Sequence, residues 1–454
     1  MNTPICDFVR DYAARQPDRL HMPGHKGRGA AEQLDITEIA GADVLYHPTG
    51  IILESEKNAA ALFGSRRTVY SAEGSSLSIR AMVFLAVQDA LKRGKTPRIA
   101  AGRNAHKVFI TAAALLDVQV QWLYPAQSGG LLTCQITPET LEEALRHGES
   151  VTAVYVTSPD YLGNVADISG LSRVCRRYGC LLLVDNAHGA YLGFLPGGQH
   201  PMSQGADLCC DSAHKTLPVL TGGGYLHISS HAPVEFDSMA DSAMALFAST
   251  SPSYLILQSL DAANGILDGR WQRALHHATV EWAAVKRHIA ALGFCLTGQE
   301  PLKLTVMPKR YGYTGEQLAE LLERKNIYCE FADPDYLVLM LPVEYDPALP
   351  RRICAAFESI SPRAEITTPA PALGRGVSVL SPHGALFRPA EQVTLSQSLG
   401  RVMADPTVSC PPAIPVVCCG ERIDPWAVEA MAYYGITHVR VLKETSDKRE
   451  ENFR

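Results

Sequence analysis

Short apolar runs alternate with helix-length amphipathic stretches from about residue 66 to residue 230. The clearest runs, 151–156 and 180–185, are apolar almost throughout. Strands of this kind are typically covered on both faces, and helices between them indicate crossover connections. The pattern therefore predicts an α/β domain on a mostly parallel sheet. The expected strands are 68–70, 98–100, 119–123, 151–156, 180–185, 206–211 and 224–228, and the expected helices between them are 76–92, 108–116, 138–146 and 171–178.

The pattern changes after about residue 295. Two long helices are expected first, and short strands then alternate with helices, which is typical of a smaller α+β domain. We therefore expect residues 1–50 to pack on a large domain over 51–290, followed by a small C-terminal domain over 295–454. The expected elements are helices at 253–267, 270–292, 315–324 and 348–360 and strands at 303–306, 327–331 and 336–341.

Composition narrows the class of protein. Of 454 residues, 46% are hydrophobic and 19% are charged, which is typical of a globular chain. The net charge of −6 argues against a general nucleic-acid partner. No apolar run is long enough to cross a membrane, and charged residues interrupt the first twenty positions, so we expect a cytoplasmic protein. The twelve cysteines lack zinc-site spacing and are expected to be reduced thiols, with no metal site.

Three segments after predicted strands contain candidate chemistry. Lys215 follows the strand at 206–211 and precedes a glycine-rich stretch. Lysine is rarely buried without a partner, although Lys215 alone also fits an ordinary loop lysine. Asp185 ends the strand at 180–185, where ligands bind in open α/β sheets, and it equally fits a turn aspartate. His188, three residues later, alone fits a hydrogen-bonded structural imidazole.

The third segment is Gly74-Ser75-Ser76, at the start of the helix expected after strand 68–70. Free amides, the helix dipole and two hydroxyls there suit an anion, although a plain serine cap is equally common. The segment is neither a P-loop nor a dinucleotide fingerprint. An anion site, a buried acid and a lysine on successive strand ends together match the needs of pyridoxal phosphate. The lysine binds its aldehyde, and the acid pairs with its ring nitrogen.

Several motifs resemble one family over most of the chain. The sequence is similar to the bacterial ornithine/lysine/arginine decarboxylases, in their short form without a response-regulator-like N-terminal domain. The resemblance implies a fold-type-I, aspartate aminotransferase-like fold and decarboxylation of a basic amino acid to an amine and CO₂. It also implies a homodimer or higher oligomer with shared active sites. The matching motifs are HMPGHKG at 21–27, AEGSSLSIRAM at 72–82, RNAHK at 103–107, TSPDYLG at 157–163, DNAHG at 185–189, SAHK at 212–215 and CPPAIPVVCCGE at 410–421.

The resemblance also implies a role for each matching residue. Lys215 would hold the cofactor as a Schiff base, Asp185 would pair with its ring nitrogen, and His214 would move a proton beside Lys215. His106 and Ala187 would lie on opposite faces of the ring. The other expected residues are Gly74, Ser75, Ser76 and Ser212 at the phosphate, His188 near the ring and the substrate carboxylate, and Glu421 at the substrate's distal cation in the partner subunit.

Departures from the family pattern leave two alternatives open. Asn186, Gly222 and Cys419 stand where the family often has other residues. These departures would fit a non-catalytic paralogue that binds the cofactor. A second alternative is another fold-type-I enzyme, an aminotransferase or a lyase, which would bind the substrate carboxylate through an arginine such as Arg375 or Arg388. The choice among ornithine, lysine and arginine as substrate also stays open.

Overall fold

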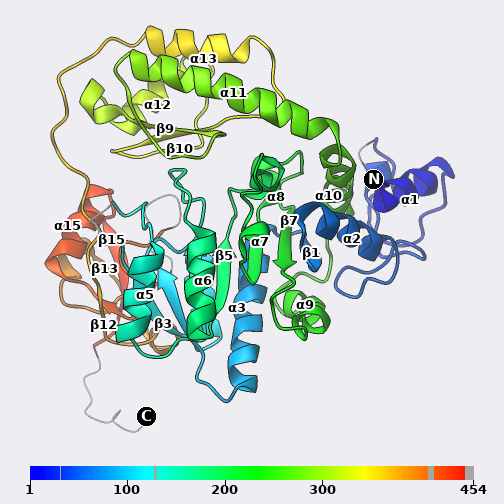
Figure 1. Ribbon diagram of the computed structural model, residues 1–454, viewed down its shortest axis with the longest axis horizontal. Helices are drawn as coiled ribbons and strands as arrows, with labels where there is room; N and C mark the ends of the chain where they lie inside the picture. Colours follow the sequence, from blue (N-terminus) through cyan, green and yellow to red (C-terminus); the bar gives the residue numbers. More distant parts are fainter. Residues whose placement is uncertain (31, 127–129, 407–413, 445–454) are drawn as a thin grey trace.

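The computed structural model describes residues 1–30, 32–126, 130–406 and 414–444. Its centre is a seven-stranded sheet, seen in Figure 1. The strand order is β1-β7-β6-β5-β4-β2-β3. Only β7 runs against its neighbours, so the predicted mostly parallel sheet is confirmed. The strands are β1 (Arg67–Ser71), β2 (Arg98–Gly102), β3 (Gln119–Leu123), β4 (Ala153–Thr157), β5 (Leu181–Asp185), β6 (Leu208–Asp211) and β7 (Gly224–Ile228).

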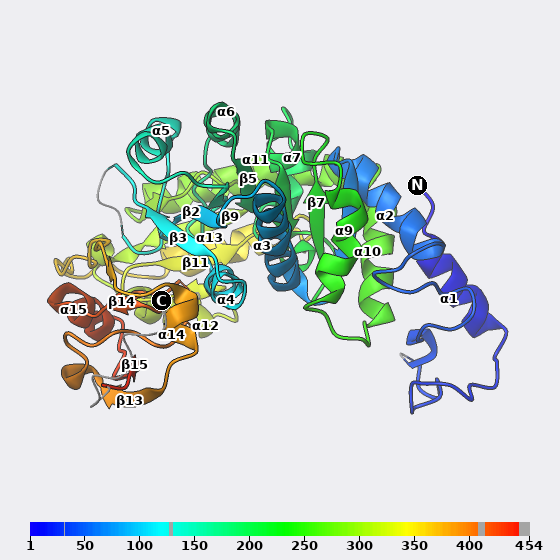
Figure 2. The ribbon, with the colours of Figure 1, turned by 90° about the horizontal axis from the view of Figure 1, so that it is seen from below.

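Helices cover both faces of this sheet, as its apolar strands require. Figure 2 shows α5, α6 and α7 on one side and α3, α4 and α9 on the other. Helix α3 contacts β5, β6 and β7. It therefore packs along the strands that lead to Asp185, at the end of β5, and to Lys215, after β6. The covering helices are α3 (Gly74–Lys92), α4 (Lys107–Leu115), α5 (Pro138–His147), α6 (Ile168–Tyr178), α7 (Pro201–Gln204) and α9 (Phe236–Ala245).

A second, antiparallel sheet lies beside the first and is covered by three helices (Figure 1). The strand expected at 327–331 begins only at Phe331. Asn326 has a left-handed φ of 58°, and the Ile327 amide donates to the Leu322 carbonyl, so these residues end a helix instead. The elements are α11 (Arg270–Ala291), β8 (Cys295–Thr297), β9 (Lys303–Met307), α12 (Gly315–Glu323), β10 (Phe331–Ala332), β11 (Leu337–Met340) and α13 (Leu349–Glu358).

The chain after residue 360 leaves this sheet and returns to the large domain. Two strand pairs form there, and His383 contacts the carbonyl of Ala114 in α4 at 2.8 Å from its Nδ1. Figure 2 places this segment at the opposite end of the molecule from the N-terminal helix. We therefore propose residues 295–360 as the small domain. The C-terminal elements are β12 (Val377–Ser378), α14 (Pro382–Leu386), β13 (Ala390–Thr394), β14 (Glu421–Arg422), α15 (Pro425–Tyr433) and β15 (His438–Leu442).

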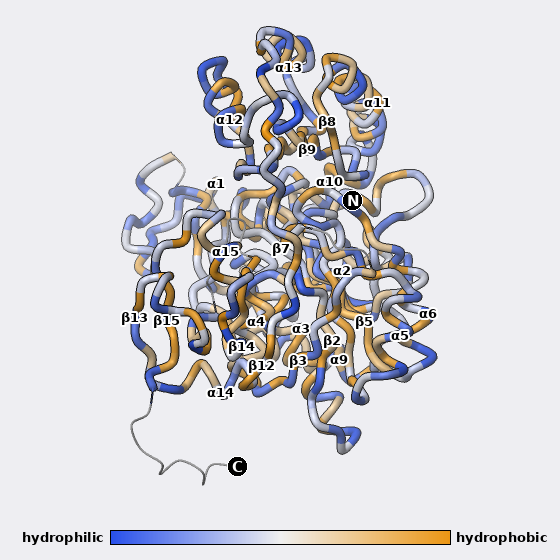
Figure 3. Tube along the Cα trace, turned by 90° about the vertical axis from the view of Figure 1, so that its left-hand side faces the viewer, coloured by the Kyte–Doolittle hydropathy of each residue, from blue (hydrophilic) through white to orange (hydrophobic). Residues whose placement is uncertain are grey.

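The N-terminal segment is fixed to the large domain by α1 (Pro4–Ala14), which packs on α2 (Ile51–Phe63) and α10 (Tyr254–Leu267). The Cys6 amide donates to Asp261 Oδ2 at 2.9 Å. Figure 3 shows hydrophobic positions gathered along the strands and polar positions in the outer loops. Within the described ranges, no helix is both long and apolar enough to cross a membrane.

Glu56 on α2 makes the stability of the folded protein depend on pH. Its side chain is buried, Oε1 accepts from the Tyr70 amide at 2.9 Å, and Oε2 has no partner. Burial raises the pKa of this carboxyl from 4.5 to about 8. The folded protein therefore keeps a proton that the unfolded chain loses near pH 4.5, so the Glu56 contribution to stability decreases as the pH rises toward 8.

Glu56→Gln should remove this pH dependence, because glutamine resembles the protonated acid. We expect the variant to match the wild type near pH 4.5 and to be more stable by about 2–4 kcal/mol near pH 8. Thermal unfolding at both pH values measures the difference. Glu54→Gln, an exposed position on the same helix, serves as the control. Equal unfolding temperatures of wild type and Glu56→Gln at pH 8 would contradict the assignment.

Candidate active site

Lys215 lies at the carboxyl end of the sheet, in the short helix α8 (Ala213–Thr216) that follows β6. Its Nζ is 3.1 Å from Nε2 of His188, which follows the neighbouring strand β5. Burial lowers the pKa of Lys215, so an uncharged amine is easier to form there than in water. A cavity of about 360 Å³ reaches this side chain between Trp271 and the end of β11. Lys215 is thus a nucleophile with access from outside.

Asp185 is a buried acid without a cationic partner among the described residues. It is the last residue of β5 and is only 2% exposed. Oδ2 accepts from the Tyr155 hydroxyl at 2.9 Å, and Oδ1 accepts from the Ala187 amide at 3.2 Å. These two donors and the Cys210 thiol, 3.6 Å from Oδ1, are neutral, so they orient the carboxylate but leave its charge uncompensated, which is costly for a buried group. The position suits a cationic group that no described residue supplies.

Three histidines surround Lys215 and Asp185. His106 caps α4, with Nδ1 accepting from the Val108 amide at 3.2 Å, so its Nε2 bears the proton. Burial lowers the pKa of His106 and of His188, and both rings are neutral at pH 7. His214 Nδ1 lies 2.9 Å from the Gly223 carbonyl, which leaves its Nε2 as a proton acceptor. The structure thus brings together His106, His188, His214, Asp185 and Lys215.

The first turn of α3 lies beside the lysine loop. The Ser212 hydroxyl donates to the Ser75 hydroxyl at 2.7 Å. The Gly74 amide donates to Gly222, so the free amides of the helix begin at Ser75 and Ser76. A Cβ at Gly224 would lie 3.1 Å from the Ser75 amide nitrogen and 2.8 Å from the Asp211 carbonyl. These residues form a cradle that suits an anion.

Two departures from the family pattern have local explanations. Gly222 has a φ of 101°, and a Cβ there would lie 2.9 Å from the Ala72 carbonyl oxygen, so only glycine fits easily. Asn186 Nδ2 donates to Asp211 Oδ1 at 2.6 Å. A glutamate at 186 would place a second carboxylate against Asp211, so asparagine suits this chain. Cys419 is buried, and nothing in the structure explains its presence.

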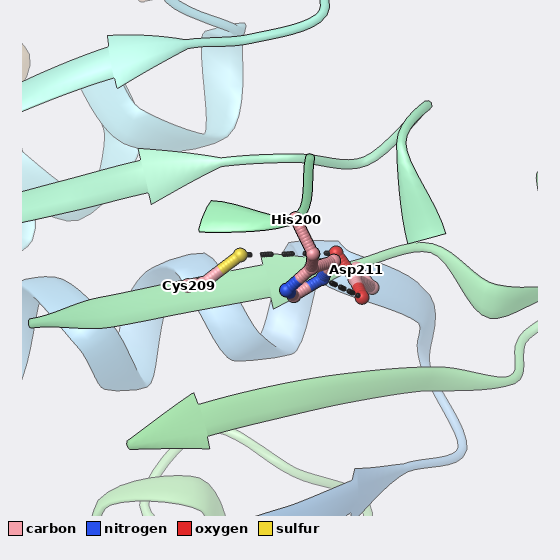
Figure 4. A group of neighbouring side chains, drawn as sticks. All are labelled: His200, Cys209 and Asp211. Carbon is pink, nitrogen blue, oxygen red and sulfur yellow. Dashed lines mark hydrogen bonds and ion pairs between the residues drawn. The ribbon is translucent and has the colours of Figure 1, made fainter. Parts of the chain in front are cut away.

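Asp211 belongs to a buried polar group with His200 and Cys209 (Figure 4). His200 Nε2 donates to Asp211 Oδ2 at 2.9 Å, because its Nδ1 already accepts from the Met202 amide. His227 Nε2 reaches the same oxygen at 3.1 Å. Since these hydrogen bonds satisfy the aspartate, the group fixes the end of β6 before Lys215 without needing a metal.

Glu421 lies in a buried ion pair with Arg103, which belongs to the segment that also contains His106. Its Oε2 is 3.2 Å from Arg103, and it also accepts from the Cys418 amide at 2.7 Å. Arg103 additionally donates to the carbonyls of two residues in the C-terminal segment, at 415 and 416. The ion pair therefore joins the end of β2 to the C-terminal segment that follows residue 360. Residues 410–413 of the CPPAIPVVCCGE motif lie outside the described residues. Arg375 stacks over Tyr124, and Arg388 lies exposed after α14.

Breaking the buried pair should destabilise the protein. We expect Arg103→Met to lower the free energy of unfolding by about 3–5 kcal/mol, because Glu421 would remain buried without a cation. Thermal unfolding measures the loss. The double variant Arg103→Met/Glu421→Gln should recover part of it, since it leaves no buried charge. A single variant as stable as the wild type would contradict this interpretation.

Sequence reasoning missed two tyrosines of the site. Tyr155 contacts Asp185 from inside β4, an apolar strand in which no pattern distinguishes it. Tyr161 lies in the loop after β4, and its ring packs edge-on against His188 with centroids 5.1 Å apart. Tyr161 belongs to the TSPDYLG motif, and this was the feature of the sequence that could have identified it as a site residue.

Comparisons with known proteins agree with this arrangement. A family model described as "Orn/Lys/Arg decarboxylase, major domain" matches residues 3–300. The uncharacterized protein YaaO of Bacillus subtilis is 31% identical, over 95% of this chain and 94% of its own length. An arginine decarboxylase of Bacillus anthracis is 28% identical, over 93% of this chain and 90% of its own.

Solved structures show the same fold. Lysine decarboxylase A from Pseudomonas aeruginosa has a TM-score of 0.80 at 15% identity, covering 97% of this chain and 80% of its own. The fold is therefore that of the fold-type-I pyridoxal phosphate enzymes, as expected. With the family model matching well over half of the sequence, the chain belongs to the Orn/Lys/Arg decarboxylase family and is an amino acid decarboxylase.

Proposed function

We propose that this protein decarboxylates a basic L-amino acid, with L-arginine as the first candidate, and that pyridoxal phosphate is bound on Lys215. The observation that supports this most is Lys215 Nζ at 3.1 Å from His188, beside the buried and uncompensated Asp185. L-Arginine comes first because curated relatives named arginine decarboxylase align over 92–93% of this chain. L-Lysine and L-ornithine are the next candidate substrates.

The residues present fit the cofactor. The hydroxyls of Ser75 and Ser212 and the free amides of α3 would hold the phosphate. Glycine at 224 lets β7 pack closely on the start of α3, because a Cβ there would lie 2.9 Å from the Gly74 carbonyl carbon. Asp185 would supply the charge that a protonated ring nitrogen needs. His106 and Ala187 would lie on the two faces of the ring. When bound, the group supplies an electron sink for the carbanion left by loss of CO₂.

The chain's own residues would orient the substrate and move protons. Tyr155 and the Ala187 amide hold the Asp185 carboxylate in place, so its charge is fixed before the reaction begins. His188 lies beside Lys215 Nζ and can exchange a proton with it. After CO₂ leaves, Nζ of Lys215, or Nε2 of His214 once it has taken up a proton, would protonate the α-carbon. Apolar walls around the departing carboxylate would favour a neutral product.

An amine-release assay tests the proposal. Purified protein with added pyridoxal phosphate is given L-arginine, L-lysine and L-ornithine separately, and CO₂ and amine are both measured. We expect amine and CO₂ in equal amounts, with the highest kcat/KM for L-arginine. Formation of a keto acid would instead indicate an aminotransferase. Cofactor binding without CO₂ from any of the three would indicate a non-catalytic paralogue.

We also propose a homodimer or higher oligomer. Leu20 and Met22, at the HMPGHKG motif, are 94% and 65% exposed in the single chain. Exposed apolar side chains that lie close together indicate a contact surface, and two such side chains stand here within three positions. Light scattering after size-exclusion chromatography measures the mass, and a monomer at micromolar concentration would contradict the proposal.

A further inference from the structure

The distal cation of a basic amino acid needs a carboxylate at the far end of the substrate pocket. Glu421 of the partner subunit was expected there; within the single chain, the Glu421 carboxylate is buried against Arg103. Glu300 forms a buried pair with Lys303 at 3.0 Å, and Asp160 is buried and accepts from Asn164. Each of these acids is buried beside a partner from its own chain, although Oε1 of Glu421 accepts no hydrogen bond from the described residues. A carboxylate that binds substrate has to be unpaired and accessible.

Glu330 meets both conditions. It lies just before β10 on the small domain and is exposed. Within the described part of the chain, no lysine, arginine or histidine pairs with it; its Oε1 accepts from the Tyr161 hydroxyl at 3.1 Å. This hydrogen bond joins the small domain to the loop after β4, and Phe331 packs edge-on against the same tyrosine ring.

A continuous series of contacts connects Glu330 to the reactive lysine. The Tyr161 ring lies 5.1 Å from the His188 ring, and His188 Nε2 lies 3.1 Å from Lys215 Nζ. The Glu330 carboxylate thus lies two side chains away from the reacting nitrogen, which suits the far end of a long amino acid side chain. Lys303 passes over the same tyrosine ring, but its charge is compensated by Glu300.

The electrostatics agree with this placement. Burial lowers the pKa of Lys215, and the carboxylates of Asp185 and Glu330 oppose that shift. Asp185 is assigned to the cofactor ring in the proposed function. Glu330 is thus an acid outside the proposed cofactor site whose field reaches Lys215.

We propose that Glu330 is the specificity-determining residue that binds the distal guanidinium or ammonium of the substrate, with Tyr161 orienting its carboxylate. The inference rests on the proposed function. Guanidinium and ammonium groups form strong charge-assisted hydrogen bonds with a carboxylate. A substrate that bridges Glu330 and Lys215 also joins the small domain to the large one, so it is aligned at both ends.

The test compares each basic substrate with its uncharged isostere: L-citrulline for arginine, L-2-aminoheptanoate for lysine and L-norleucine for ornithine. Glu330→Gln should lower kcat/KM for the basic substrate about 10- to 100-fold, mainly through KM. It should change kcat/KM for the isostere by less than about fivefold. Tyr161→Phe should give a smaller loss in the same direction. Glu320→Gln, an exposed position on α12, serves as the inert control.

A second measurement does not depend on turnover. Calorimetric titration of the holoenzyme with the product amine should show weaker binding to Glu330→Gln than to wild type. Unchanged substrate discrimination in Glu330→Gln, or an equal loss with the isostere, would overturn the inference. So would loss of discrimination in Glu344→Gln, at the Lys215 cavity, with none at Glu330. If the wild type decarboxylates no basic substrate at all, the proposed function itself fails.

Discussion

Replacing Lys215 with alanine is expected to abolish turnover and covalent attachment of pyridoxal phosphate. Its Nζ lies 3.1 Å from His188 Nε2 at the carboxyl end of the sheet, and alanine offers no nucleophile. Loss of a covalent nucleophile costs on the order of 10³-fold in rate or more. Borohydride reduction followed by mass spectrometry of peptides should locate the cofactor on residue 215 in the wild type and on no peptide in the variant.

The matched control for this experiment is Lys57→Ala, an exposed lysine on α2. It should retain wild-type turnover and labelling at Lys215. Labelling of a different lysine in the wild type, or substantial amine release by Lys215→Ala, would contradict the assignment. Thermal unfolding of the variant separates a chemical loss from a folding loss, because removing a buried amine leaves no charge unpaired.

The sequence was sufficient to predict the parallel sheet and the residues at its strand ends. Apolar strands such as β4 and β5 can be identified from a few consecutive residues. The polar residue that ends β5 lies at the edge of the sheet where ligands bind in this class of fold. Asp185, His188 and Lys215 were therefore predictable, and the structure brings them together.

Contacts between segments that are distant in the sequence could not be predicted from local patterns. The ion pair of Arg103 with Glu421 joins residues more than three hundred positions apart, and nothing local in either motif indicates it. Glu330 follows a helix end that resembled a strand, and its hydrogen bond to Tyr161 depends on how the small domain lies on the large one. Local sequence patterns indicate the helices and strands and where they end. Which carboxylate remains without a cationic partner depends instead on how the two domains pack against each other.

Asp185→Asn is expected to retain the cofactor and lose most of the rate. Asparagine has nearly the same shape, and the Tyr155 hydroxyl, which donates to Oδ2 in the wild type, can rotate to accept from an amide instead. The variant therefore keeps its fold but loses the negative charge that would hold the ring nitrogen protonated. Removing a preorganised electrostatic contact of this kind costs on the order of 10²- to 10³-fold in kcat.

Tyr155→Phe is the matched control, because it removes the hydrogen bond to Asp185 and leaves the charge in place. We expect a loss of about tenfold at most, since one neutral hydrogen bond contributes about 1 kcal/mol. Steady-state kcat and the amount of bound cofactor separate the two effects. A wild-type rate in Asp185→Asn with full cofactor would show that the buried charge is not needed, and loss of the cofactor would show that Asp185 binds it rather than activates it.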